Sequence, residues 1–140
     1  MNKVLVTGAA GFIGSQLSAR LMERGLTVKG IDNFNRHLYD PELKVDRMKH
    51  FNLDIWGCDL KDEVKLEALL RDFKPDTIIH LAAMAGVRDS MGKEKSYHAN
   101  NIDATQNLID ICKQHLPETR IIYASTSCVY AGSPTPWTEG

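Results

Sequence analysis

The sequence predicts an α/β fold in which residues 1–140 form a doubly wound parallel sheet with strand order 3-2-1-4-5. Three observations support this prediction. Short segments rich in β-branched residues alternate with longer amphipathic segments, which is typical of parallel strands joined by crossover helices. Glycines follow the first short segment and open the next helix. The apolar run from Thr77 to Leu81 is typical of a central strand covered on both faces.

Hydrophobic periodicity and helix start and stop signals give the boundaries of each element. Strands are expected over residues 3–7, 27–32, 53–58, within 76–81 and over 120–124, and helices over residues 12–24, 41–49, 62–72 and about 96–115. Gly25 is expected to cap the first helix, and Pro41 to begin the second. The first helix is expected to carry one apolar face, formed by Phe12, Ile13, Leu17 and Leu21. The apolar stripe of the last helix is expected to comprise Ile102, Thr105, Leu108, Ile109, Cys112 and Leu116.

Composition is that of an ordinary globular protein with the length of one domain. The net charge of −1 gives no electrostatic reason to expect nucleic acid or an anionic membrane as a partner. Three scattered cysteines without a Cys-x-x-Cys pair indicate neither a disulfide framework nor a metal site. The N-terminus shows no signal-peptide pattern, and no apolar run is long enough to span a bilayer. We therefore expect a cytoplasmic protein.

The first strand runs into a glycine-rich turn that indicates a binding site for a dinucleotide pyrophosphate at a helix N-terminus. Gly8 permits the tight turn, and Gly11 allows backbone N–H groups to approach the phosphates. Gly14 allows the helix to pack closely on the sheet. The other residues of this turn that we expect at the cofactor are Ala10, Phe12 and Ile13.

A carboxylate at the end of the second strand, Asp32, is placed to accept hydrogen bonds from the hydroxyls of an adenosine ribose. Its charge disfavours a 2′-phosphate, so we expect NAD rather than NADP as the cofactor. Arg36 is a nearby cation that could weaken this discrimination. The alternative interpretation is a plain turn with a helix-capping aspartate.

Residues after the third, fourth and fifth strands share the same predicted edge of the sheet. Asp59 and Leu60 border the expected adenine pocket, although an aspartate before a helix is equally typical of an N-cap. Small residues follow His80, in the order Leu81, Ala82 and Ala83, and allow the backbone to approach a cofactor. His80 itself is expected to be a buried, hydrogen-bonded histidine rather than a base. The hydroxyls of residues 125–127 either contact a substrate alcohol or cap the strand end.

Together these segments resemble the extended short-chain dehydrogenase/reductase superfamily, in its NAD-dependent nucleotide-sugar epimerase/dehydratase branch, over the whole chain. The ordered motifs are residues 7–14 (Thr-Gly-Ala-Ala-Gly-Phe-Ile-Gly), Asp32-Asn33, Asp59-Leu60, residues 80–83 (His-Leu-Ala-Ala), Asn101 before residues 105–108 (Thr-Gln-Asn-Leu), and residues 125–130 (Ser-Thr-Ser-Cys-Val-Tyr). Two segments resemble the UDP-glucuronate 4-epimerases more narrowly: residues 32–47, which include Tyr39, and residues 85–90.

The resemblance implies a Rossmann-type domain that binds NAD and a UDP-sugar, in a homodimeric enzyme of polysaccharide biosynthesis that inverts a sugar carbon by transient oxidation at C4. It places Asn33 and Asn101 beside the cofactor. Thr126 would hold the C4 oxygen for a catalytic tyrosine, with Ser127 and Arg88 as further substrate contacts. Cys128 stands where related dehydratases and decarboxylases carry an acidic residue, which favours epimerisation.

The family's catalytic Tyr-x-x-x-Lys is absent, because Ser127 and Pro134 stand four positions after Tyr123 and Tyr130. The substrate domain is absent as well, so we expect no turnover by this chain alone. The exposed last strand should favour self-association. Two alternatives remain open: a non-catalytic NAD-binding or sensing module, and a different reaction, as in UDP-glucose 4-epimerases or UDP-glucuronate decarboxylases and dehydratases.

Overall fold

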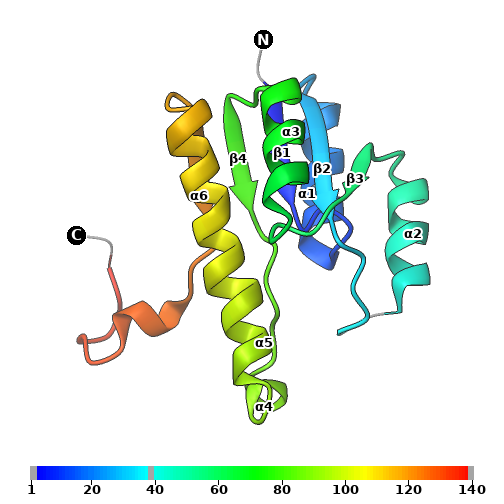
Figure 1. Cartoon of the computed structure of the whole chain (residues 1–140). Coiled ribbons are helices and arrows are strands. Elements are labelled where there is room, and N and C mark those ends of the chain that lie inside the picture. Colours follow the sequence, from blue (N-terminus) through cyan, green and yellow to red (C-terminus); the bar gives the residue numbers. More distant parts are fainter. Residues whose placement is uncertain (1–2, 38–39, 139–140) are drawn as a thin grey trace.

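A five-stranded parallel sheet with the order β3-β2-β1-β4-β5 forms the centre of the molecule, as predicted. The computed structural model describes residues 3–37 and 40–138. The strands are β1 (Lys3–Thr7), β2 (Thr27–Asp32), β3 (Ile55–Gly57), β4 (Thr77–His80) and β5 (Arg120–Tyr123). All five run in the same direction, so their carboxyl ends meet at one edge (Figure 1).

The helices are α1 (Phe12–Glu23), α2 (Pro41–His50), α3 (Glu63–Phe73), α4 (Val87–Ser90), α5 (Glu94–His98) and α6 (Ala104–His115). A π-helical turn over Ala99–Asp103 joins α5 to α6, so that the three form one long helix reaching past the carboxyl edge of the sheet (Figure 1). The main differences from the sequence prediction are a shorter β3, the additional helix α4, and a 3₁₀ turn over Ser127–Tyr130. No helix among the described residues is long and apolar enough to cross a membrane.

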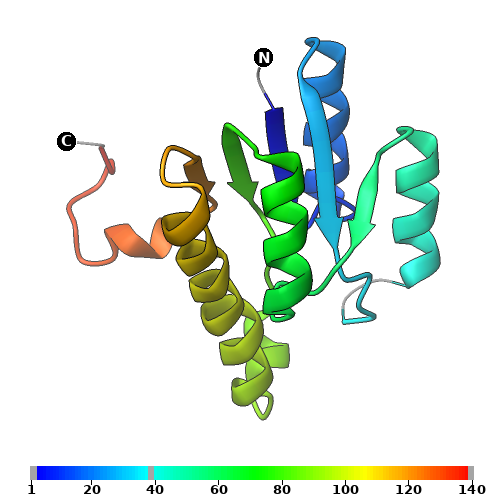
Figure 2. The ribbon, with the colours of Figure 1, turned by 45° about the horizontal axis from the view of Figure 1, so that its top comes forward.

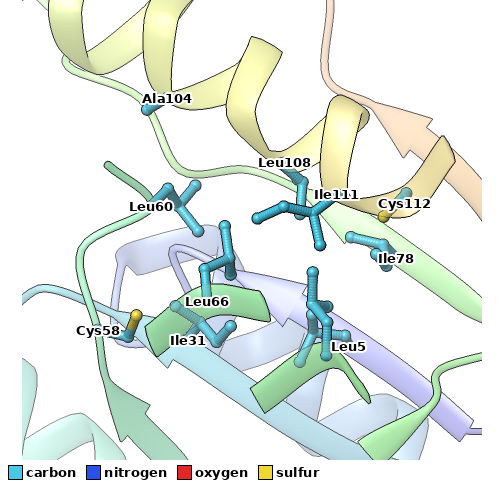
Figure 3. Close-up of a cluster of buried hydrophobic side chains, with 11 residues drawn as sticks. Leu5, Ile31, Cys58, Leu60, Leu66, Ile78, Ala104, Leu108, Ile111 and Cys112 are labelled. Atoms are coloured by element: carbon cyan, nitrogen blue, oxygen red, sulfur yellow. The ribbon is translucent and has the colours of Figure 1, made fainter. Parts of the chain in front are cut away.

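Two apolar cores lie on opposite faces of the sheet, as a doubly wound fold requires. On one face, strand residues such as Leu5 and Ile78 meet Leu66 of α3 and Leu108 of α6, all of them fully buried (Figure 3). On the other face a smaller core around Val6 packs beneath α1. α2 lies beside β3, at the far end of the sheet from β5 (Figures 1 and 2).

The predicted apolar face of α1 is wrong at its first two positions. Phe12 is 64% exposed and Ile13 is 65% exposed. The helix instead approaches the sheet through Gly14, Ser15 and Ser18, which are all buried. Small side chains on this side of the helix allow its axis to lie close to the strands, and Phe12 and Ile13 fall outside that side.

The buried side of the last helix also differs from the prediction. Ile102, predicted on the buried stripe, is 56% exposed, whereas Ile111, which was not predicted there, is buried. At 3.6 residues per turn, Leu108, Ile111 and Cys112 share one side of α6, and Ile102 falls outside that side. The predicted stripe is therefore rotated relative to the side that meets the sheet.

His80 is a buried strand histidine, as predicted, and its hydrogen bonds fix its tautomer. Its Nδ1 lies 2.7 Å from Thr7 Oγ1, and its Nε2 lies 2.9 Å from Thr105 Oγ1. The Thr105 hydroxyl donates to the Asn101 carbonyl, so it accepts a hydrogen bond from Nε2–H. The Thr7 hydroxyl accepts from two backbone N–H groups and therefore donates to Nδ1. His80 is thus a neutral imidazole, and its burial lowers its pKa.

We expect Gly14→Ala to lower the free energy of unfolding by about 1–3 kcal/mol, the usual result of overpacking. A Cβ at Gly14 would lie 2.2 Å from the carbonyl oxygen of Gly8, so the turn must move. Helix propensity alone would make this substitution stabilising. Gly57→Ala is the matched control, because its Cβ would meet no atom within 4 Å. Urea denaturation measures both, and equal effects would contradict the interpretation.

We expect acid to destabilise the fold through His80. Its folded pKa lies below the unfolded value of 6.5. The unfolded state therefore binds the proton first, so this contribution is complete above pH 6.5 and declines as the pH falls below that value, by at most about 1.4 kcal/mol per pH unit. The melting temperature should fall between pH 7.5 and pH 5 less steeply in His80→Gln than in the wild type. The exposed His50, replaced by Gln, is the control, and parallel pH profiles for all three proteins would refute this role.

Candidate cofactor site

A hollow of about 130 Å³, partly open to solvent, lies at the carboxyl edge of the sheet. Many of the residues predicted at the cofactor line it, namely Gly8, Gly11, Asp32, Asn33, Asp59, Leu60, Leu81, Ala82 and Ala83. Others were not predicted there, namely Ile31, Asn35, His37, Lys44, Cys58, Met84, Asn100 and Ala104.

The turn between β1 and α1 presents an open helix N-terminus to this hollow. Gly8 adopts a φ of 69°, which favours glycine, and its N–H donates to the Ile31 carbonyl at 2.8 Å. Gly11 is the N-cap residue, and no side chain caps the helix or places an acid in its first turn. Backbone N–H groups at such an end are available to an anion, and the helix dipole favours negative charge there.

Asp32 is held firmly at the end of β2, with its carboxylate on the wall of the hollow. One oxygen accepts from the Ala10 N–H at 3.2 Å, and the other accepts from the Phe34 N–H at 2.8 Å. Ala10 therefore acts through its backbone on Asp32, while its side chain is buried. The cation beside this carboxylate is Lys44, whose Nζ lies 3.2 Å from Asp32 Oδ1. Arg36, the cation suggested by the sequence, is exposed.

Asp59, which follows the neighbouring strand β3, also lines the hollow and is tied to Asn33, whose amide donates to Asp59 Oδ2 at 3.0 Å. Partial burial acts to raise the pKa of the Asp59 carboxyl, but hydrogen bonds from the Lys61 N–H and from Asn33 outweigh it and leave the pKa below its usual value. The N-cap of α3 is Asp62, which accepts from the Lys65 N–H at 3.1 Å. The capping interpretation of Asp59 is therefore wrong.

The third wall, after β4, is fixed from both sides. The Thr7 hydroxyl accepts from the N–H groups of Leu81 and Ala82, each at 3.2 Å. From the long helix, the Asn101 amide accepts from the Met84 N–H at 2.7 Å and donates to the Met84 carbonyl at 2.9 Å. Asn101 thus holds the backbone that borders the hollow and is not itself among the residues that line it.

A second set of contacts joins the segment after β2 to the loop after β4. His37 Nε2 lies 2.9 Å from the Tyr97 hydroxyl and 3.3 Å from Asp89 Oδ2. The Tyr97 hydroxyl also lies 2.8 Å from the Ala85 carbonyl. A hydrogen bond from Tyr97 contributes to a pKa of Asp89 below its usual value, after a larger contribution from Lys93. These contacts hold together the two segments that resemble UDP-glucuronate 4-epimerases, except Tyr39, which lies outside the described residues.

The residues predicted to contact the substrate lie away from the hollow. Arg88 is exposed on α4, and Ser127 is exposed in the 3₁₀ turn. Thr126 caps that turn, accepting from the Cys128 N–H at 3.2 Å. The segment after β5 leaves the body of the molecule beside α6, as both views show (Figures 1 and 2). Phe12 and Ile13 are likewise outside the hollow, exposed at the start of α1.

The unpredicted residues of the hollow come from places where sequence patterns carry little information. Lys44 lies on α2, whose other residues form a polar surface helix, so only its burial distinguishes it. His37 and Asn100 reach the hollow from a loop and from the π turn. The one sequence signal that pointed to these residues was the segment between Asp32 and Lys44, which resembles the UDP-glucuronate 4-epimerases.

Known proteins are similar to this chain in sequence, and solved structures are similar to it in fold. UDP-glucuronate 4-epimerase 3 of Arabidopsis thaliana is 41% identical over 97% of the chain, and UDP-glucuronate 4-epimerase 6 of the same plant is 45% identical over 97%. The chain spans about a third of the length of these relatives, at 32% and 30% respectively.

Solved structures agree. UDP-glucuronic acid 4-epimerase from Bacillus cereus, in complex with UDP-glucuronic acid and NAD, is 38% identical with a TM-score of 0.83, over 98% of this chain and 44% of that one. UDP-glucose 4-epimerase from Bifidobacterium longum, in complex with NAD⁺ and UDP, gives a TM-score of 0.84 at 29% identity, over 99% of this chain and 41% of that one. Residues 4–139 match the NAD dependent epimerase/dehydratase family, and the chain belongs to that family.

Proposed function

We propose that this chain is the NAD-binding part of a UDP-glucuronate 4-epimerase, which interconverts UDP-glucuronate and UDP-galacturonate. Residues 1–140 would form an incomplete NAD-binding domain, and the substrate domain would lie outside them. The observation that carries the proposal is the hollow at the sheet edge, where the open N-terminus of α1 and the carboxylate of Asp32 border one space. The relatives named UDP-glucuronate 4-epimerase support the choice of substrate.

The residues present fit NAD. The N–H groups behind Gly11 would hold the pyrophosphate, and Asp32 would accept hydrogen bonds from the adenosine ribose. Asn33, Asp59 and Leu60 border the space that an adenine would fill. When bound, NAD supplies the hydride acceptor for oxidation at the sugar C4. The contacts of Tyr97 with His37 and with the Ala85 carbonyl would hold the segment after β2 and the loop after β4 at a fixed separation.

Residues after β5 and on α4 would serve the sugar. Thr126 would hold the C4 oxygen, while Ser127 and Arg88 would contact the UDP-sugar. All three are exposed. Cys128, also exposed, is no ready proton carrier for chemistry at C5, which favours epimerisation over loss of water or CO₂. The alternatives are a non-catalytic NAD-binding module, a UDP-glucose 4-epimerase, and a UDP-glucuronate decarboxylase or dehydratase.

A cytoplasmic location is proposed as well, with no nucleic acid and no membrane as partners. It is supported by Cys58, Cys112 and Cys128, which are free thiols of a kind that persists in reducing compartments. The near-neutral net charge of −1 supports the absence of a polyanionic partner.

A chimaera tests the reaction. It joins these 140 residues to the remainder of the Bacillus cereus UDP-glucuronic acid 4-epimerase, which would bring a catalytic tyrosine and lysine. We expect it to convert UDP-glucuronate to UDP-galacturonate without CO₂ release, as followed by chromatography, and to lose at least about tenfold in rate when Thr126 is replaced by Val. The unextended chain is the control and should show no turnover.

Release of CO₂ as the main outcome would overturn the assignment in favour of a decarboxylase. A chimaera that binds NAD and shows a native circular dichroism spectrum, yet leaves UDP-glucuronate unchanged, would favour the non-catalytic module. Conversion of UDP-glucose in preference to UDP-glucuronate would indicate a UDP-glucose 4-epimerase.

We further propose that the full protein is a homodimer and that the chain self-associates. β5 ends the sheet and bears the large exposed residues Ile122 and Tyr123, and no strand among the described residues pairs with its outer edge. Such an edge invites pairing with another chain. Light scattering should give a mass that rises with concentration, and less so for Ile122→Lys. A clean monomer at about 10 mg/ml would refute self-association of the chain.

A further inference from the structure

Lys44 is the one residue of α2 that is buried among the described residues of that helix. Its side chain is 9% exposed, and its Nζ lies 3.2 Å from Oδ1 of Asp32, whose side chain is 5% exposed. Burying an ammonium group is costly unless it is paired, so a lysine at this position is not explained by an ordinary surface role. Both residues line the hollow at the sheet edge.

Groups of the chain itself already fill most of the hydrogen-bond accepting capacity of Asp32. Its carboxylate accepts from the Ala10 and Phe34 N–H groups and from Lys44 Nζ. A carboxylate offers about four lone-pair positions, so about one position is left to accept from a ribose hydroxyl. An ammonium has three donors, and Lys44 uses one of them on Asp32. Asp32 and Lys44 therefore act on a ligand as a pair, in which Asp32 can accept and Lys44 can donate a further hydrogen bond.

We propose that Lys44 is a second specificity-determining residue for the adenosine ribose, acting as a cation that Asp32 holds in place. The inference rests on the proposed binding of NAD. The pair is close to neutral, so it rejects a 2′-phosphate less strongly than a lone carboxylate would. Preference for NAD over NADP then depends on the Asp32 carboxylate offsetting the charge of Lys44, and loss of that carboxylate leaves an unpaired cation beside the 2′ position.

A double-mutant cycle tests this in the purified chain. NAD and NADP are titrated calorimetrically into the wild type, Lys44→Met, Asp32→Asn and the double variant, and the ratio of the NADP to the NAD dissociation constant is compared. This ratio is independent of any unfolded fraction, because both ligands bind the same folded population. Lys49→Met is the control, since it removes a charge from an exposed position of the same helix.

We expect Lys44→Met to raise the ratio about tenfold and Asp32→Asn to lower it about 100-fold, the order of magnitude of a close charge in a half-open site. In the double variant the fall should be at least about tenfold smaller than in Asp32→Asn, because the freed cation is gone. Lys49→Met should leave the ratio unchanged.

Two results would overturn the inference. One is a ratio in Lys44→Met equal to that of the wild type. The other is a fall in the ratio that is as large in the double variant as in Asp32→Asn. Either result with NAD still bound would leave the proposed function standing. A wild type that binds neither nucleotide would instead count against the proposed function itself.

Discussion

The close fit of the turn after β1 is the constraint on which the site depends. This turn is locked backbone to backbone against both neighbouring strands: Ile31 accepts from the Gly8 N–H, and a Cβ on Gly8 would lie 2.9 Å from the nitrogen of Ala82. Gly14 closes the third side against the Gly8 carbonyl. Three contacts made by main chain alone therefore hold the start of α1 in place, and its N-cap residue Gly11 borders the hollow.

A chain of polar contacts carries this constraint through the sheet. Thr7, at the end of β1, binds the backbone after β4 and also His80. His80 in turn reaches Thr105, whose hydroxyl binds the Asn101 carbonyl. Each group in the chain is satisfied by the next, so the buried polar atoms stabilise one arrangement instead of penalising it. A neutral His80 suits this role, because a charged ring could not accept from Thr7.

Sequence reasoning recovered what depends on local spacing. The strand order, the glycine turn and the position of Asp32 follow from residues close together in the chain, and the structure has all three. It missed what depends on packing between distant segments. Lys44 looks like any lysine on a polar helix until its ion pair with Asp32, at the end of β2, is seen. Phe12 fits an apolar face by periodicity, yet small residues decide which side of α1 meets the sheet.

The π turn over Ala99–Asp103, which the sequence did not predict, bears on the site. The helix must bury Leu108 against the sheet and also turn Asn101 toward Met84. With 3.6 residues per turn, residues seven apart lie about 20° from each other, so a regular helix would serve both. However, Tyr97, which precedes the π turn, also has to contact Ala85. The extra residue of the π turn rotates the part of the helix that carries Tyr97 against α6, and π turns are frequent at functional sites. The long helix therefore packs on the sheet through Leu108 and holds the wall after β4 through Asn101.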